Sequence, residues 1–300
     1  MSSLAIGFFD GVHLGHQAIL RGADAALTFR NHPLTVLAPE KSPRLIMTCD
    51  ERIAAIKACG VRNVTVLDFT RELAEMPAES FVSRYLLSSV PRLPSSVRCG
   101  ANWRFGKGGV GNAAFLRAKG IDVVVAPCTE YRGERISSSR IRAALERGEI
   151  EDANAMLGRR FEVQGLKFKG KGLGAAIDYP TINLKLSTLN LKLPLGVYEV
   201  EVEGRKAIAN YGLAPTMGDK AWGKPVLEIH VLQTGGEDVG REMPDEMTVS
   251  LVRFIRPEKK FDSVSDLQRQ IAADCAAVRG FRAPEGRRGS FENVTQHPEA

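Results

Sequence analysis

Cysteine is scarce in this chain, and no two cysteines are close enough in the sequence to form a metal-binding or redox pair. There are five in 300 residues, an odd number with no Cys-x-x-Cys spacing: Cys49, Cys59, Cys99, Cys128 and Cys275. That scarcity argues against a disulfide framework and against a structural zinc site. It suits a reducing compartment, so we expect a cytoplasmic protein.

Long apolar runs and aromatic residues are also lacking. No run approaches the roughly 18 apolar residues that a membrane-spanning helix needs. Gly7, Asp10 and His13 interrupt the first apolar stretch, which therefore does not match a secretory signal. Aromatic residues make up only 7%, and the net charge of +6 is spread evenly, unlike a nucleic-acid-binding stripe. We expect neither a membrane nor a nucleic-acid partner. The positive charge is either a solvated surface or an attraction for polyanionic small molecules such as ATP.

What the sequence does contain, up to Gly158, is an alternation of short apolar strands and helical segments. A length of 300 residues suits two domains. Expected strands are 4–8, 26–29, 61–67, 97–100 and 121–126, and expected helices are 16–21, 51–58 and 80–88. This order predicts a Rossmann-like α/β domain over 1–158, a parallel sheet with helices on both faces. Ligands of such sheets bind at the carboxyl ends of the strands.

After Gly158 the pattern changes to strands separated by Gly- and Pro-containing turns. Expected strands are 161–168, 196–202, 206–209, 226–232 and 247–254, followed by one helix over 263–278. The pattern predicts a second domain over 159–282, a small antiparallel β-barrel with a C-terminal helix. The polar segment 283–300 is expected to be a disordered tail.

The segment Gly7-Phe8-Phe9-Asp10-Gly11-Val12-His13-Leu14-Gly15-His16 joins the first expected strand to the first expected helix. Its two histidines are three residues apart and can point the same way out of one helical turn. Imidazoles and a helix N-terminus together offer positive character to a phosphate, and the glycines let a nucleotide approach the backbone. A chance pair and a metal pair are the alternatives, although no third ligand accompanies the histidines.

A second anion site is predicted by Ile136-Ser137-Ser138-Ser139-Arg140-Ile141-Arg142. Three hydroxyl groups open an expected helix, with Arg142 one turn further in. An ordinary serine cap explains one of these serines but not three with an arginine.

The second half carries its own pattern for phosphate chemistry. Thr181 and Asn183 are two residues apart, so they project to one side of an extended segment and can bind a magnesium ion held by phosphates. The glycines of 170–174 can wrap phosphates with backbone N–H groups. Glu228, flanked by apolar residues, can act as a base with a raised pKa. The residues alone also allow a plain turn at 180–183 and an exposed edge position for Glu228.

Taken together, these motifs resemble the prokaryotic bifunctional riboflavin kinase/FMN adenylyltransferase (FAD synthetase) family. The first half resembles nucleotidylyltransferases through the His-x-x-His and Ser-Ser-Ser segments, and the flavin-specific branch through Asn102-Trp103-Arg104-Phe105-Gly106. Class I aminoacyl-tRNA synthetases share the histidine motif but carry a Lys-Met-Ser-Lys-Ser-like loop that is missing here. The second half resembles riboflavin kinases through Pro180-Thr181-Ile182-Asn183, Leu227-Glu228-Ile229-His230 and Gln270-Ile271-Ala272-Ala273-Asp274. The resemblance covers roughly residues 4–282.

The resemblance implies an enzyme that phosphorylates riboflavin to FMN in the second domain and adenylylates FMN to FAD in the first. Its substrates are riboflavin, FMN and ATP, with Mg²⁺ as cofactor and FAD as product; no oligomeric state is indicated. The implied catalytic residues are His13, His16 and Glu228. The implied magnesium ligands are Thr181 and Asn183, and the implied flavin-binding residues are Asn102, Arg104, Phe105 and Asn210. The implied ATP- and phosphate-binding residues are Gly7, Phe9, Asp10, Gly11, Gly15, Ser137, Ser138, Ser139, Arg142, Gly170, Gly172 and Gly174.

Several positions depart from the family pattern. Phe8 stands where a polar residue is common and Trp103 where phenylalanine is usual, and the stretch from Gln17 to Phe29 is short. In the second half the departures are Asp178 for glycine, Ala214 for arginine and Val239 for tyrosine. They leave open a weakened kinase or an altered flavin preference. Two alternatives therefore remain: an adenylyltransferase whose barrel only binds flavin, and a non-catalytic flavin- or nucleotide-binding regulator.

Overall fold

The computed structural model describes residues 3–86, 95–170, 174, 177–187, 191–213, 225–232, 243–280 and 294–297. The chain divides into two compact units, residues 1–140 with 292–300 and residues 141–291. Gly172, Ala214 and Val239 lie outside the described residues. Within the described part, no helix is long and apolar enough to cross a membrane.

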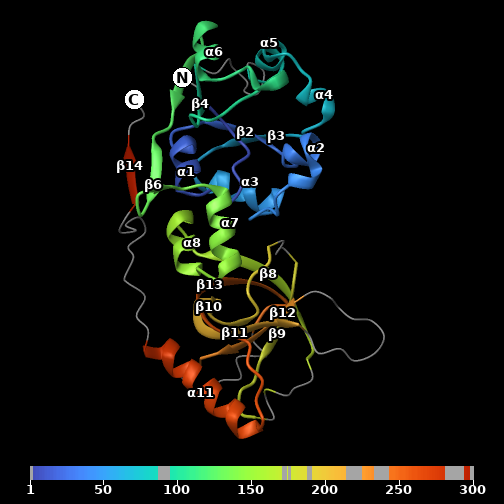
Figure 1. The fold of residues 1–300 in the computed structure, drawn as a ribbon, viewed down its shortest axis with the longest axis vertical. Coiled ribbons are helices and arrows are strands. Elements are labelled where there is room, and N and C mark those ends of the chain that lie inside the picture. Colours follow the sequence, from blue (N-terminus) through green and yellow to red (C-terminus); the bar gives the residue numbers. More distant parts are fainter. Residues whose placement is uncertain are drawn as a thin grey trace. The chain divides into compact units, whose positions relative to one another are not determined.

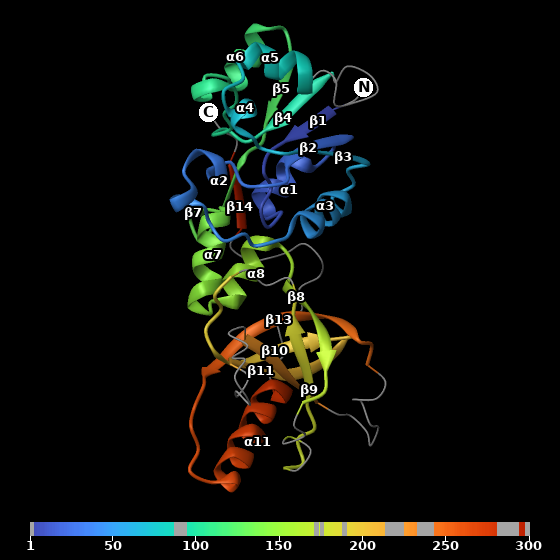
Figure 2. The same ribbon diagram turned by 90° about the vertical axis from the view of Figure 1, so that its right-hand side faces the viewer.

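A five-stranded parallel sheet forms the centre of the first unit, in the order β3-β2-β1-β4-β5 (Figure 2). Its strands are β1 (Ser3–Ile6), β2 (Ala25–Phe29), β3 (Asn63–Leu67), β4 (Ser96–Cys99) and β5 (Asp122–Val125). The order changes direction at β1, because β1 pairs with β2 on one side and with β4 on the other. Such a switch point is where a parallel sheet binds its ligand. The five strands predicted from the sequence are confirmed, with ends that differ by one or two residues.

Side chains that alternate along each strand pack into two different hydrophobic cores, one on each face of this sheet. Leu4 and Ile6 of β1 belong to a core shared with α4–α6, whereas Ala5 between them faces a core shared with α1 and α3. Successive residues of a strand point to opposite faces, so both faces need a helical cover. The helices are α1 (Leu14–Leu20), α2 (Leu34–Leu37), α3 (Cys49–Ala58), α4 (Arg71–Ala74), α5 (Ala78–Phe81) and α6 (Ala113–Ala118). The predicted doubly covered sheet is confirmed.

A smaller sheet in the first unit includes the end of the chain. It consists of β6 (Cys128–Tyr131), β7 (Glu134–Arg135) and β14 (Val294–His297), with β14 antiparallel to β6. Figure 1 shows β14 beside β6. The expected disorder of 283–300 therefore does not hold for these four residues, because β6 offers them an edge to pair with.

The second unit is a closed antiparallel barrel of six strands, in the order β10-β11-β12-β9-β8-β13. The strands are β8 (Phe161–Phe168), β9 (Ile182–Leu186), β10 (Gly196–Val202), β11 (Arg205–Leu213), β12 (Pro225–Val231) and β13 (Glu246–Pro257). The predicted barrel is confirmed, and β9 is a strand that the sequence prediction omitted. The helices α7 (Ser138–Arg147) and α8 (Ile150–Leu157) precede it.

Helix α11 (Val264–Gly280) lies alongside the barrel (Figure 1). It covers part of the outer face, where Cys275 and Val278 pack on Val197, Ile208 and Leu232. An ion pair fixes it, because Arg256 at the end of β13 contacts the buried Asp274 carboxylate at 2.8 Å. The helix predicted for 263–278 is confirmed, and Asp274 of the Gln270–Asp274 segment has a structural role in holding it.

Two candidate active sites

The loop between β1 and α1 is held in a strained conformation. Phe9 and Val12 have φ values of 59° and 41°, which cost residues other than glycine about 1–3 kcal/mol each. Both side chains are buried. The buried Asp10 carboxylate accepts backbone N–H groups from Ile46 at 3.0 Å and from Met47 at 3.3 Å. Asp10 therefore holds the loop in place, a role that the sequence did not suggest.

His13 and His16 leave this loop together, as predicted. Their rings stack with centroids 3.6 Å apart and planes at 21°. The Nδ1 atom of His13 accepts the backbone N–H of His16 at 3.3 Å and so caps α1. Because Nδ1 is the acceptor, the proton of neutral His13 lies on Nε2.

Burial makes His16 a neutral group. The His13 ring lies on one side of it, and the Phe9 ring meets it edge-on at 5.4 Å. Burial, helped by the charge of Arg135, lowers the pKa of His16 to about 3. Its Nδ1 has no hydrogen-bond partner among the described residues. The expected positive character at this position is thus wrong for His16 at neutral pH, and the ring offers a hydrogen bond instead of a charge.

The serine segment starts α7, as the sequence predicted, but two of its hydroxyl groups are engaged. Ser137 Oγ accepts the backbone N–H of Arg140 at 3.2 Å, which is a helix cap. Ser138 Oγ donates to the carbonyl oxygen of Asp10 at 2.9 Å and ties the helix start to the strained loop. Arg142 lies one turn further along α7. Ser138 thus connects the start of α7 to the 7–16 segment, the two segments that the sequence predicted as anion sites.

An aromatic pocket of about 400 Å³ opens beside the same loop. Arg104 and Phe105 line it as expected for flavin-binding residues, whereas Asn102 is not among the lining side chains. Six aromatic residues share this lining: Phe8, Phe29, Phe69, Phe81, Trp103 and Phe105. Trp103 stacks on Phe105 with centroids 4.6 Å apart.

Sequence reasoning missed several residues of this site. It noted Phe8 and Trp103 only as departures from a pattern, although both line the pocket. It also missed the fully buried Arg52, whose guanidinium lies 4.3 Å from the Phe8 ring centroid. It also missed Arg135, whose charge lowers the pKa of His16. The only signal for Arg135 in the sequence is its place two residues before the serine segment.

The second candidate site is a row of polar side chains across three barrel strands. Asn210 of β11 pairs with Glu228 of β12, which in turn pairs with Asn183 of β9. Directly opposite residues of antiparallel strands share a face. The flanking Leu227 and Ile229 are buried, so the row lies on the outer face of the barrel, the face that α11 partly covers. The row brings together three residues predicted separately as flavin ligand, base and metal ligand.

The side chains of this row are half-buried, and none makes a hydrogen bond to another described residue. Burial, reinforced by the charge of Glu258, raises the pKa of Glu228. A raised pKa suits a carboxylate that must take a proton from an alcohol.

The loop before β9 fits closely against the row. A Cβ atom on Gly170 would overlap the Asn183 amide, and one on Gly174 would overlap the Tyr179 carbonyl oxygen. Thr181 is exposed. His230 fixes the neighbouring backbone, because its Nδ1 donates to the Pro180 carbonyl oxygen at 3.0 Å. These contacts explain why glycine occupies positions 170 and 174 and why histidine occupies position 230. Threonine and asparagine oxygens form a donor set that suits Mg²⁺ bound to phosphates.

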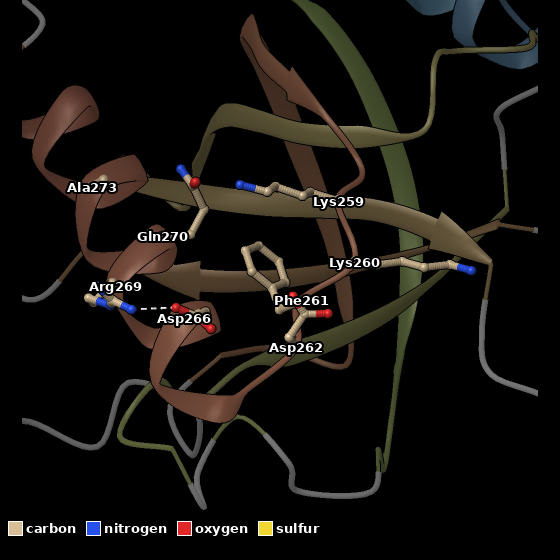
Figure 3. A pocket seen from close by; sticks show the side chains of 8 residues that line it. All are labelled: Lys259, Lys260, Phe261, Asp262, Asp266, Arg269, Gln270 and Ala273. Atoms are coloured by element: carbon tan, nitrogen blue, oxygen red, sulfur yellow. Dashed lines mark hydrogen bonds and ion pairs between the residues drawn. The ribbon is translucent and has the colours of Figure 1, made fainter.

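A further pocket of about 420 Å³ lies between the segment 259–262 and the first turns of α11. Figure 3 shows Lys259 pointing toward Gln270 and Lys260 pointing away, with the Phe261 ring between loop and helix. Arg256 and Lys259 place positive charge 5.9 Å and 5.6 Å from the centroid of that ring.

The fold and the two candidate sites fit the class of transferases with two separate centres for nucleotide phosphates, one at a parallel sheet and one on a barrel. The family model for FAD synthetase matches residues 1–140, and the model for riboflavin kinase matches residues 157–281. The chain belongs to the family of bifunctional riboflavin kinase/FMN adenylyltransferases.

Relatives with that description align with nearly the whole chain. The Bacillus subtilis (strain 168) protein is 32% identical over 300 residues, covering 93% of this chain and 92% of its own. The Escherichia coli (strain K12) protein is 32% identical over 297 residues with the same coverage. A crystal structure described as a macrolide-efflux protein from Streptococcus pneumoniae shares the fold, with a TM-score of 0.81 at 27% identity over 94% of each chain.

Proposed function

We propose that this chain makes FAD from riboflavin in two steps at its two sites. The barrel transfers the γ-phosphate of ATP to the terminal ribityl hydroxyl of riboflavin, giving FMN and ADP. The parallel-sheet unit then joins the FMN phosphate to the α-phosphorus of a second ATP, giving FAD and pyrophosphate. The observation that carries this proposal is the pair of separate candidate sites, one at the loop between β1 and α1 and one across the strands of the barrel. The family membership of both halves supports it.

Glu228 is the proposed base of the kinase step. It accepts the proton of the attacking ribityl hydroxyl, and its raised pKa matches that task. Thr181 and Asn183 are the proposed ligands of Mg²⁺, which neutralises charge on the phosphates when it is bound. Asn210, beside Glu228 in the row, is the proposed flavin contact. Because Gly170 and Gly174 have no side chain, the backbone at these two positions can lie close to Asn183 and Thr181.

His13 and His16 are the proposed catalytic pair of the adenylyl transfer. Both can donate hydrogen bonds to the α-phosphate as its charge develops, and such donors typically contribute about a hundredfold or more to the rate. The strained loop at Phe9–Val12 aims them, and Gly7, Gly11 and Gly15 belong to the same nucleotide segment. No protein base is needed, because the attacking FMN phosphate is already an anion.

The leaving pyrophosphate is proposed to bind at the start of α7. Backbone N–H groups, the Ser139 region and Arg142 support this assignment. The aromatic pocket with Arg104 and Phe105 is the proposed site of the FMN ring. We also propose a cytoplasmic location, which the free thiols of all five cysteines support.

The proposal is tested by incubating the purified chain with riboflavin, ATP and magnesium and separating the flavins by chromatography. We expect FMN to appear first and FAD to follow. Formation of FAD from supplied FMN, but no FMN from riboflavin, would instead establish the adenylyltransferase with a flavin-binding barrel. Binding of both flavins without turnover would establish the regulator.

A further inference from the structure

Glu258 is a carboxylate that the reaction as described does not use. It follows the last residue of β13 and is exposed, with no hydrogen bond or ion pair to any described residue. Nevertheless it faces the kinase site. A Cβ atom on Gly212 of β11 would overlap Glu258 Oε1, and the same atom would lie 3.1 Å from the Asn210 amide nitrogen. The Glu258 carboxylate and the Asn210 amide therefore converge on one point of β11.

The segment that carries Glu258 is fixed on both sides. Arg256 contacts Asp274 of α11 through both its Nε and Nη2 atoms, at 3.1 Å and 2.8 Å. The same guanidinium lies over the Phe261 ring. Gln270 adds a hydrogen bond to Asp274 at 3.0 Å. These contacts hold the backbone of the segment, from which the Glu258 side chain reaches Gly212.

The order of strands gives the site two different ends. Asn183 on β9, with Gly170 against its side chain, forms the end proposed for magnesium and phosphates. Glu228 on β12 lies in the middle, and Asn210 and Gly212 on β11 form the other end. Glu258 is at this other end, and its charge is felt by Glu228.

A carboxylate beside Asn210 and Gly212 is suited to bind a hydroxyl group of a substrate and not a phosphate. Placed beside a triphosphate it would be repelled, whereas a hydroxyl group donates a charge-assisted hydrogen bond to it. Lys259, the next residue, lines the pocket of about 420 Å³ shown in Figure 3.

We propose that Glu258, together with Asn210, binds the ribityl hydroxyls of riboflavin and so selects a flavin that carries a polyol chain. This inference rests on the proposed kinase function of the barrel. It assigns Glu258 to substrate binding and leaves the chemical step to Glu228.

The test compares Glu258→Ala with Glu246→Ala, which removes an exposed carboxylate at the opposite end of β13. Affinity is measured by quenching of flavin fluorescence in the presence of magnesium and ADP, with riboflavin and with lumichrome, the ring without its chain. We expect Glu258→Ala to weaken riboflavin binding about tenfold, as for a lost hydrogen bond to a charged group, and to leave lumichrome binding within twofold. In steady state, the KM for riboflavin should rise with little change in kcat or in the KM for ATP. Glu246→Ala should match the wild type throughout.

A second variant tests the geometry. Gly212→Ala places a methyl group where Glu258 Oε1 lies, so it should weaken riboflavin binding as Glu258→Ala does. The double variant Gly212→Ala/Glu258→Ala should bind riboflavin about as weakly as either single variant. An unchanged KM for ATP in FMN formation reports that the barrel of each variant is folded.

Equal weakening for lumichrome, a change in the KM for ATP alone, or an unchanged KM for riboflavin would each overturn the assignment of Glu258. A wild-type chain that forms no FMN would instead overturn the kinase function on which the assignment rests, so the two failures are distinguishable.

Discussion

The two sites obtain their geometry in different ways. In the parallel-sheet unit, the proposed catalytic histidines come from one segment of ten consecutive residues, and a strained backbone with buried side chains positions them. On the barrel, Asn183, Glu228 and Asn210 come from three strands, and only the strand register brings them together. One site is local and buried, and the other is assembled and half-exposed.

This difference sets how each site tunes its acids and bases. Burial keeps His16 neutral and leaves it to act by hydrogen bonding. On the barrel, moderate burial and a neighbouring carboxylate raise the pKa of Glu228, so the group can accept a proton. Similar desolvation thus suppresses charge in both sites, although it produces a donor in one and a base in the other.

The largest expected effect separates the two sites most cleanly. Glu228→Gln keeps the shape of the side chain but removes the base, so kcat for FMN formation should fall about a thousandfold. The KM for ATP and the conversion of FMN to FAD should not change. Full kinase turnover in this variant would remove Glu228 as the base.

The independence of the two units can be tested by two fragments that end at Arg282. The sequence places a boundary at Gly158, whereas the compact units divide after Arg140. Asn154 of α8 donates to the Leu251 carbonyl oxygen at 2.9 Å and accepts the Phe161 N–H at 2.6 Å. A fragment from Glu149 keeps this helix, and one from Arg159 loses it.

We expect both fragments to phosphorylate riboflavin without making FAD. The shorter one should be less stable by about 3–4 kcal/mol in urea unfolding, because it loses two buried hydrogen bonds and an apolar helix face. Equal stabilities would show that α8 does not belong to the barrel unit.

At the sheet site, His16→Ala should lower the rate of FAD formation by about a hundredfold or more, since it removes the proposed N–H donor to the transferred phosphate. FMN formation from riboflavin should stay within twofold and serves as the control. Near-normal turnover of FMN to FAD would contradict the catalytic role of His16.

The buried state of His16 also has a consequence for stability. Its pKa is about 3 in the folded chain and about 6.5 when unfolded, so its stabilising contribution is complete above pH 6.5 and is lost as pH falls toward 3. Between pH 7.5 and pH 5 the wild type should lose about 2 kcal/mol more unfolding free energy than His16→Asn. Parallel stability profiles for the two proteins would show that His16 is not held neutral.

The smallest expected effect concerns Asp178, where the family pattern has glycine. Its φ of 63° is left-handed, which explains the preference for glycine at this position. Asp178→Gly should raise the unfolding free energy by about 0.5 kcal/mol, because relief of strain exceeds the added freedom of the unfolded chain. Asp178→Ala should lower it, and kinase turnover should stay the same in both. A loss of magnesium affinity in both variants would instead place the Asp178 carboxylate near the metal.

Much of the fold was predictable, because strands buried on both faces and strands around a closed barrel leave different apolar patterns. The first unit shows this in Leu4, Ala5 and Ile6, which are all buried although they face opposite cores. Strand β9 was missed although Ile182, Leu184 and Leu186 alternate with polar residues, because Pro180 just before it indicated a turn. The pairing of β14 with β6 was unpredictable from a polar sequence, because the edge that receives it lies far away in the chain.

The sequence by itself determined the two domain types, the His-x-x-His and serine segments, and the groups that are proposed to contact phosphate. It could do so because those features are local: periodicity, turn residues and short spacings. Tertiary structure alone decided that His16 is neutral, that Asp10 and Ser138 hold the loop, and that Glu258 lies beside Gly212, near Asn210. These properties depend on burial and on contacts between residues distant in the chain, and neither is encoded in any short stretch of sequence.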